Sequence, residues 1–184
     1  MISREEAFVI LKRYLNEPDN IKYSFAVEAV MKELARILSR DEELWSRTGL
    51  LHNLDYEYTK DDLANRGNLS AQLLEGLIPD KGVNAIKSNN YMHTDYIPTT
   101  SIDKSLIAVD AVCMLIFATA KAQPSKKVDD VDLNMLITRF NDASFAPLVN
   151  RSRIELCNDV GLDLKAFLTL SLVTIKAISG SIGL

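Results

Sequence analysis

The stretch SLIAVDAVCMLIFATA, residues 105–120, decides the fold because it is apolar on every face of a helix except at one carboxylate, Asp110. A membrane-spanning helix needs about 20 apolar residues, whereas this run is shorter and carries an acid near its centre. We therefore expect a central helix buried inside a helical protein. An ionised carboxylate is costly to bury without a partner, so Asp110 is expected to be protonated, hydrogen-bonded, or paired with a cation or metal.

Outside this run, apolar residues recur at a spacing of three to four, which is typical of amphipathic helices, and no segment alternates long enough to indicate a strand. The sequence therefore predicts an all-α protein of roughly eight to ten helices in a single domain, residues 1–184. Ser3 and Glu6 form a capping box for the first helix, which Pro18 and Asp19 are expected to close. The expected helices cover about residues 4–15, 21–39, 42–52, 69–77, 81–88, 105–120, 131–140, 151–159 and 164–180.

Composition narrows the classes of function. The net charge is -4, and the 21 basic residues are scattered along the chain, so we expect no nucleic-acid partner. Cys113 and Cys157 both lie in apolar helical patterns, which predicts reduced core residues and not a disulfide scaffold. The N-terminal stretch MISREEAFVILKRYL has two acids directly after its first basic residue and no uninterrupted apolar region. We therefore expect no signal peptide, no membrane partner and a cytoplasmic location.

A second informative stretch is LLHNLDYE, residues 50–57, which ends an apolar helix in a histidine, an amide and two acids. Such groups are costly to bury unless they have partners. At a helix C-terminus the dipole favours His52 as an imidazolium, and an ion pair with Asp110 would satisfy both groups without a metal. Asp55 and Glu57 could supply an acid to a pocket, although the pattern favours a solvated helix end for both.

The order of several fragments resembles the HD-domain superfamily, in the small bacterial and archaeal branch of predicted HD-superfamily hydrolases. That family implies an all-helical fold in which a His, a consecutive His-Asp pair and a distant Asp hold a divalent metal, commonly for phosphoester or nucleotide hydrolysis. Imidazoles and carboxylates suit first-row divalent ions, and the bound water becomes a nucleophile. The fragments, in chain order over roughly residues 15–175, are YSFAVEAVMKELA, LLHNLDYE, RGNLSAQLLEGL, VNAIKSNN, SIDKSLIAVDAV, ATAKAQPSKKVDDV and FAPLVNR.

The metal ligands implied by this resemblance are only half retained. His52 matches the paired histidine and Asp110 the distant aspartate, but Tyr23 stands where the first histidine is expected. Asn53 replaces the aspartate of the pair, keeping an oxygen donor and losing the charge. Catalytic sites usually take three protein ligands, so a divalent ion (Fe, Mn, Ni or Zn) is expected to be weakly bound or absent. A rebuilt site with a Tyr23 phenolate, or with His93 swinging in from its water-exposed loop, is the alternative.

Four further polar residues are expected to bind a ligand. Arg66 and Asn89 fall where this branch often has additional histidines, and a guanidinium can grip a phosphate with two hydrogen bonds. Lys126 and Lys127 match a basic stretch of the branch and could meet phosphate. A run of charges after a proline is also typical of a solvated loop.

Three functions from different classes follow. The interpretation we favour is an HD-type fold derived from metal-dependent phosphohydrolases, with weakened or lost metal catalysis, that retains binding of a nucleotide or phosphorylated small molecule. The second is an active metal-dependent phosphohydrolase with a rebuilt ligand set, in which His52 and Asp110 are catalytic. The third is a non-catalytic helical interaction module that forms a homo-oligomer. The first makes the protein a pseudoenzyme, and the second makes it a hydrolase.

Overall fold

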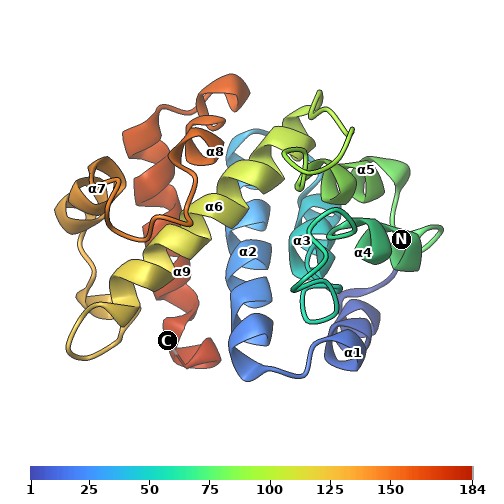
Figure 1. Ribbon diagram of the computed structural model, residues 1–184, viewed down its shortest axis with the longest axis horizontal. Coiled ribbons are helices and arrows are strands. Elements are labelled where there is room, and N and C mark those ends of the chain that lie inside the picture. Colours follow the sequence, from blue (N-terminus) through green and yellow to red (C-terminus); the bar gives the residue numbers. More distant parts are fainter. Residues whose placement is uncertain (184) are drawn as a thin grey trace.

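Nine α-helices and two short 3-10 segments make up the fold over residues 1–183, the part of the chain that the computed structural model describes (Figure 1). No strand occurs within those residues, so the prediction of an all-α fold with eight to ten helices is confirmed. The helices are α1 (Arg4–Tyr14), α2 (Pro18–Ile37), α3 (Glu42–Leu51), α4 (Asn68–Leu74), α5 (Asp80–Ser88), α6 (Ser101–Lys121), α7 (Leu133–Asn141), α8 (Arg151–Glu155) and α9 (Leu164–Ile182), and the 3-10 segments are η1 (Val128–Asp130) and η2 (Asn158–Val160).

Helix α6 is the central element. Figure 1 shows it crossing the molecule diagonally, and it packs against α2, α3, α5, α7, α8 and α9. Fourteen of its 21 residues are buried, as expected for a helix that is apolar on nearly every face. The helix begins at Ser101 and not near residue 105, because Thr100 and Asp103 form a capping box at its N-terminus. Asp110 therefore lies close to the middle of the helix that has the largest number of buried residues.

The hydrophobic core is one contiguous cluster of side chains that runs from Ala7 in α1 to Ile175 in α9. Both cysteines belong to it and neither forms a disulfide, as predicted. Burial raises the pKa of the Cys113 thiol well above its usual value and raises that of Cys157 to about 11, so both thiols stay protonated at neutral pH.

Close approach of α2 and α3 places the two helices that carry Tyr23 and His52 side by side. A Cβ built on Gly49 of α3 would lie 2.9 Å from the carbonyl oxygen of Val27 and 3.0 Å from Cγ of Met31. Only glycine lets the two backbones approach this closely. The C-terminal end of α3 is thereby held against α2, next to α6.

Helix α2 begins at Pro18, which corrects the expectation that Pro18 and Asp19 close the first helix. Proline suits the first turn of a helix, where its missing N–H would have no partner. The preceding turn is held from a distance by Glu57, whose carboxylate accepts hydrogen bonds from the backbone N–H groups of Asn16 and Glu17 and from Nδ2 of Asn20. Glu57 thus anchors the start of α2.

The last helix, α9, continues through Gly180 to Ile182, beyond the predicted end, and closes at Gly183 with φ of 66°. By length and composition alone α9 could cross a membrane. It packs against α2, α6, α7 and η1, and side chains such as Phe167 and Ile175 are fully buried in the core. Six of its 19 residues are buried, so α9 packs one face on the core.

Candidate functional site

A cavity of about 890 Å³ lies beside the middle of α6. Its walls come from α2, the C-terminal end of α3, the segment that follows α5, the loop before α8, and α8 itself. We call it the Asp110 cavity, after the carboxylate at its polar centre. Its size lies in the range of pockets that enclose a small organic molecule, about 300–1,000 Å³.

Four elements, α2, α3, α5 and α8, bring polar groups to Asp110 on α6. On one side of the carboxylate, the Tyr23 hydroxyl donates a hydrogen bond to Oδ1 at 2.7 Å, and Nε2 of His52 lies 3.3 Å from the same oxygen. On the other side, Asn89 Nδ2 lies 3.2 Å and Arg153 Nη2 lies 3.1 Å from Oδ2. The predicted meeting of His52 and Asp110 is therefore confirmed. The buried carboxylate has hydrogen-bond partners and cationic neighbours, as its cost of burial requires.

Electrostatics keep Asp110 ionised and Tyr23 neutral. Burial alone would raise the pKa of Asp110, but the adjacent His52 imidazole, the charge of Arg153 and the Tyr23 hydroxyl outweigh it and hold that pKa well below its usual range. Burial and the neighbouring carboxylate raise the pKa of Tyr23 well above its usual value. Tyr23 is therefore a neutral phenol that donates a hydrogen bond to the carboxylate.

His52 is only 3% exposed and has one ring nitrogen without a hydrogen bond. Its Nδ1 lies 2.7 Å from the carbonyl oxygen of Gly49, so Nδ1 carries the proton that bonds this oxygen. Nε2 lies within ion-pair distance of Asp110 but is misaligned for a hydrogen bond, and it has no hydrogen-bond partner within residues 1–183. The structure thus presents a buried polar atom that lacks a partner at the wall of the cavity.

Arg153 is the functional residue that sequence reasoning missed. Its three hydrogen bonds all come from Nη2, two to Asn89 and one to Asp110, while its buried Nε has no partner among the described residues. One of two arginines on a five-residue helix carries no sequence signal of its own. The only hint is its position two residues after the fragment FAPLVNR. The packing of α8 against α6 is what brings the guanidinium to the carboxylate.

Some of the remaining sequence-predicted residues line the cavity and others do not. Asn53, Arg66 and Asn89 line the Asp110 cavity, and the guanidinium of Arg66 stacks over the Tyr56 ring at 4.8 Å. The exposed loop histidine, His93, also lines it.

Lys126 and Lys127 do not line the cavity, which corrects the expectation that they bind the ligand there. They are exposed in the turn between α6 and η1, beyond the end of the helix that carries Asp110. Lys60 and Lys121 line the cavity in their place. Lys60 and Lys121 lie on segments next to the cavity, whereas Lys126 and Lys127 lie in a turn beyond it.

The acids of LLHNLDYE do not supply a carboxylate to the cavity either, and the predicted solvated helix end is wrong for Asp55. Its side chain is fully buried, and Oδ2 accepts hydrogen bonds from the backbone N–H groups of Gly67 and Ser70 at the start of α4. Glu57 instead holds the start of α2, as described above. The two acids therefore hold backbone segments of neighbouring elements: Asp55 holds the start of α4 and Glu57 holds the start of α2.

The donor set at Asp110 is smaller than the three protein ligands that a catalytic metal site usually takes. Within residues 1–183, no three His, Cys, Asp or Glu side chains lie together as a metal-binding group. His52 and Asp110 supply two donors, Tyr23 is a neutral phenol, and the Arg153 guanidinium already lies against Oδ2. A guanidinium is a permanent cation, so Arg153 already places a positive charge next to the carboxylate.

Basic side chains outnumber acidic ones around the cavity. Its lining includes four basic residues against two acids, Asp19 and Asp110, although the chain as a whole carries a net charge of -4. Asp19 is paired with one of the lysines at its mouth. The site is therefore locally positive on an acidic protein, which favours an anionic ligand. The basic residues are Lys60, Arg66, Lys121 and Arg153.

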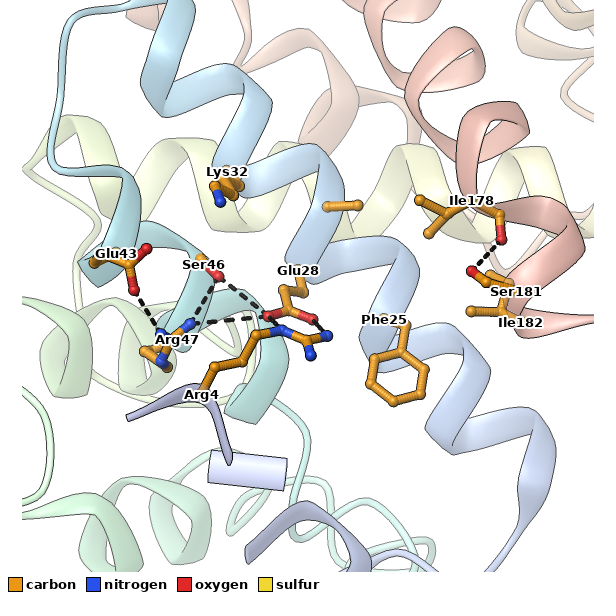
Figure 2. Close-up of a pocket in the computed structure, with 11 residues that line it drawn as sticks. Arg4, Phe25, Glu28, Lys32, Glu43, Ser46, Arg47, Ile178, Ser181 and Ile182 are labelled. Carbon is orange, nitrogen blue, oxygen red and sulfur yellow. Dashed lines mark hydrogen bonds and ion pairs between the residues drawn. The ribbon is translucent and has the colours of Figure 1, made fainter. Parts of the chain in front are cut away.

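A second, smaller cleft of about 410 Å³ lies between the start of α1, the middle of α2, the start of α3 and the end of α9. Figure 2 shows the side chains of Arg4, Glu28, Glu43 and Arg47 pointing toward one another. Glu28, only 6% exposed, accepts two hydrogen bonds from Arg4, at 2.7 and 2.8 Å, and Arg47 pairs with Glu43. These charges are paired with each other. The ion pairs stabilise the packing of the helices, and the cleft is not the candidate site.

No family model matches this chain, and no curated protein and no solved structure matches it either. The resemblance to the HD-domain superfamily therefore stays a prediction. The geometry and charge of the Asp110 cavity are the observations that bear on function.

Proposed function

We propose that this protein binds a phosphorylated small molecule, such as a nucleotide, in the Asp110 cavity without metal-dependent hydrolysis. In this proposal the chain descends from HD-type phosphohydrolases and has lost their metal chemistry. The observation that carries it is the contact of 3.1 Å between Arg153 Nη2 and Asp110 Oδ2. A fixed guanidinium there balances the carboxylate that a metal would otherwise balance, and the cavity beside it remains large.

Two unsatisfied nitrogens support an anionic ligand. His52 Nε2 and Arg153 Nε are both buried and lack hydrogen-bond partners within residues 1–183, and both residues line the cavity. Buried polar atoms in folded proteins are nearly always bonded to protein or water. Phosphate oxygens accept hydrogen bonds strongly from a guanidinium N–H, and from Nε2 of His52 when both ring nitrogens carry a proton. A phosphorylated ligand would therefore supply the partners that the protein lacks.

Arg66 is the residue best suited to bind phosphate at the mouth of the cavity. Its guanidinium is held over the Tyr56 ring at 4.8 Å and bonded to the Thr59 carbonyl at 3.2 Å. These contacts reduce the side-chain entropy that is lost when a ligand binds. Lys60 and Lys121 add positive charge on more exposed, flexible side chains.

The test is a thermal-shift and calorimetric panel of ATP, ADP, AMP and pyrophosphate, carried out in EDTA. At least one ligand is expected to raise the melting temperature, with about 2.7 kcal/mol of stabilisation at a concentration of 100 times Kd. Arg66→Ala is expected to weaken binding about tenfold through loss of a charge-assisted hydrogen bond. The matched control is the double variant Lys126→Ala, Lys127→Ala, which removes two positive charges outside the cavity.

Two results would contradict the proposal. One is that no phosphorylated compound changes the melting temperature. The other is that the Lys126 and Lys127 variant loses as much affinity as the Arg66 variant, because binding would then reflect general surface charge and not this site.

One observation favours a second candidate, an active metal-dependent phosphohydrolase. Metal-binding histidines typically donate their other ring N–H to a carbonyl or carboxylate, and His52 Nδ1 does so to Gly49. This function requires Arg153 to leave Asp110 when metal binds. It predicts near-stoichiometric iron, manganese, nickel or zinc in protein purified without chelators, and hydrolysis of phosphoesters. Metal-free protein that stays inactive after metal addition would rule it out.

A further inference from the structure

The rim of the Asp110 cavity is apolar where its centre is polar. We propose that the ligand is amphipathic: a phosphate attached to an aromatic or similarly flat apolar group that rests against this rim. The inference rests on the proposed function and goes further by naming the class of the non-phosphate part.

Exposed apolar side chains gather at this one site. The described residues include twelve large hydrophobic side chains that are exposed, and four of them line the Asp110 cavity. Single exposed apolar residues are ordinary on protein surfaces, whereas a group around one cavity marks a binding surface. The four, which we call the apolar rim, are Leu63 (42% exposed), Met92 (56%), Met114 (37%) and Leu148 (89%).

The apolar rim comes from separate parts of the chain. Leu63 lies before α4, Met92 follows α5, Met114 lies one turn beyond Asp110 on α6, and Leu148 lies in the loop before α8. Methionine side chains are flexible and polarisable, and they adapt to flat organic surfaces. Four unrelated segments have thus converged on the mouth of a single cavity.

The loop that presents Leu148 is held rigidly although its tip is exposed. Ala146 has φ of 45°, a left-handed backbone conformation that residues with a Cβ rarely adopt. Arg151 keeps the loop in this shape, because its guanidinium donates to six main-chain carbonyl groups. These belong to Arg139, Phe140, Asp142, Phe145, Ala146 and Val149.

The same loop serves the core and the cavity. Val149 is 5% exposed and belongs to the hydrophobic core, and Ala146 packs against that core, whereas Leu148 between them is 89% exposed. Strained backbone positions are often found at sites of ligand binding. The loop is thus anchored on its inner side and presents Leu148 at the cavity mouth.

The volume of the cavity also favours an organic phosphate over inorganic phosphate as the ligand. The cavity measures about 890 Å³, and pockets of this size enclose molecules far larger than inorganic phosphate. Bound phosphate alone would leave the apolar rim in water. An attached aromatic group would cover it, with a gain in affinity proportional to the apolar area removed from water.

The experiment measures the affinity of three probes in EDTA: inorganic phosphate, naphthyl phosphate and neutral naphthol. Wild-type protein is compared with the double variant Leu148→Ser, Met114→Ser and with Val173→Ser. Val173 is the matched control, because it is 61% exposed on α9 and does not line the cavity. All three substitutions replace exposed side chains, so the variants are expected to fold, and circular dichroism checks this.

Naphthyl phosphate is expected to bind wild-type protein and the Val173 variant at least about tenfold more tightly than inorganic phosphate. In the double variant that advantage should fall to about threefold or less, with the affinity for inorganic phosphate unchanged. Equal affinity of wild-type protein for the two phosphates would overturn the inference and leave the proposed function standing. The inference would also be overturned if naphthyl phosphate kept its full advantage over inorganic phosphate in the double variant.

Failure of the proposed function gives a different pattern. Naphthol that binds as tightly as naphthyl phosphate would show that the phosphate contributes nothing. In that case the apolar rim binds an apolar compound and the basic residues do not bind an anion. If no probe binds at all, the proposed function and the inference that rests on it both fail.

Discussion

Asp110 is the residue on which the polar centre of the cavity depends. Its carboxylate balances the Arg153 guanidinium and lies against His52, and both contacts are largely shielded from water. Asp110→Asn keeps the size of the side chain and removes its charge. We expect this change to lower the free energy of unfolding by about 3 kcal/mol, because it leaves a partly buried guanidinium without a counter-ion.

Urea unfolding at pH 7 measures this loss. Asp95→Asn is the control, because Asp95 is an exposed loop acid. A loss for Asp110→Asn no larger than that for Asp95→Asn would mean that the polar centre is not held by this charge.

We also expect the difference in stability between wild type and Asp110→Asn to depend on pH. Burial would raise the pKa of Asp110, but His52, Arg153 and Tyr23 hold it below the usual value of 3.8. Because the pKa is lower in the folded protein, the ionised carboxylate stabilises the fold at any pH above the usual pKa. This stability is lost as pH falls from the usual pKa toward the lowered one. The difference between wild type and Asp110→Asn should therefore persist under mildly acidic conditions and shrink only below pH 3.8.

Among the elements, the start of α2 depends on an acid from outside the helix. The pKa of Glu57 is lowered from 4.5 to about 2, because hydrogen bonds from Asn20, Glu17 and Asn16 outweigh the opposing effect of burial. Glu57→Gln should cost about 1 kcal/mol at neutral pH, as other lost helix caps do. By the same linkage, the cost is full above pH 4.5 and disappears as pH falls toward 2.

Thermal unfolding of Glu57→Gln across this pH range checks the prediction. Glu155→Gln serves as control, since the Glu155 side chain is exposed and accepts no hydrogen bond among the described residues. A pH-independent effect of Glu57→Gln would show that the carboxylate does not act through its charge.

The contact between α2 and α3 depends on one missing side chain. A Cβ at Gly49 would lie 2.9 Å from the Val27 carbonyl oxygen, so Gly49→Ala must push the two helices apart. We expect a loss of about 2 kcal/mol from this overpacking. Gly180→Ala is the control, because a Cβ there meets nothing within 4 Å, and alanine favours a helix by up to about 1 kcal/mol. Urea midpoints that move in the same direction for both variants would contradict this reading of the interface.

At the scale of the whole molecule, local patterns predict most of the helices and few of the contacts. Capping residues and apolar spacing act over a few positions, so the all-α fold and the buried α6 could be predicted. The start of α6 was missed because its capping box, Thr100 and Asp103, lies at the end of a polar loop. Pro18 was misjudged because proline both ends helices and begins them.

The candidate site could be predicted only in part, for a physical reason. His52 and Asp110 are unusual polar residues in apolar surroundings, so each is conspicuous in the sequence. Arg153 has no such local signature, because its importance comes from packing between helices that are distant in the chain. Lys126 and Lys127 were predicted from their match to a basic stretch of the family branch, and such a match does not determine which side chains face a cavity.

The central claim is that Arg153 provides the positive charge at Asp110 and that the cavity binds a phosphorylated ligand without metal. The most direct test is a calorimetric titration of the best nucleotide from the panel, once in EDTA and once with manganese, while released phosphate is measured. We predict the same affinity in both conditions and no release of phosphate. Binding that requires manganese, or phosphate released when manganese is present, would contradict the claim.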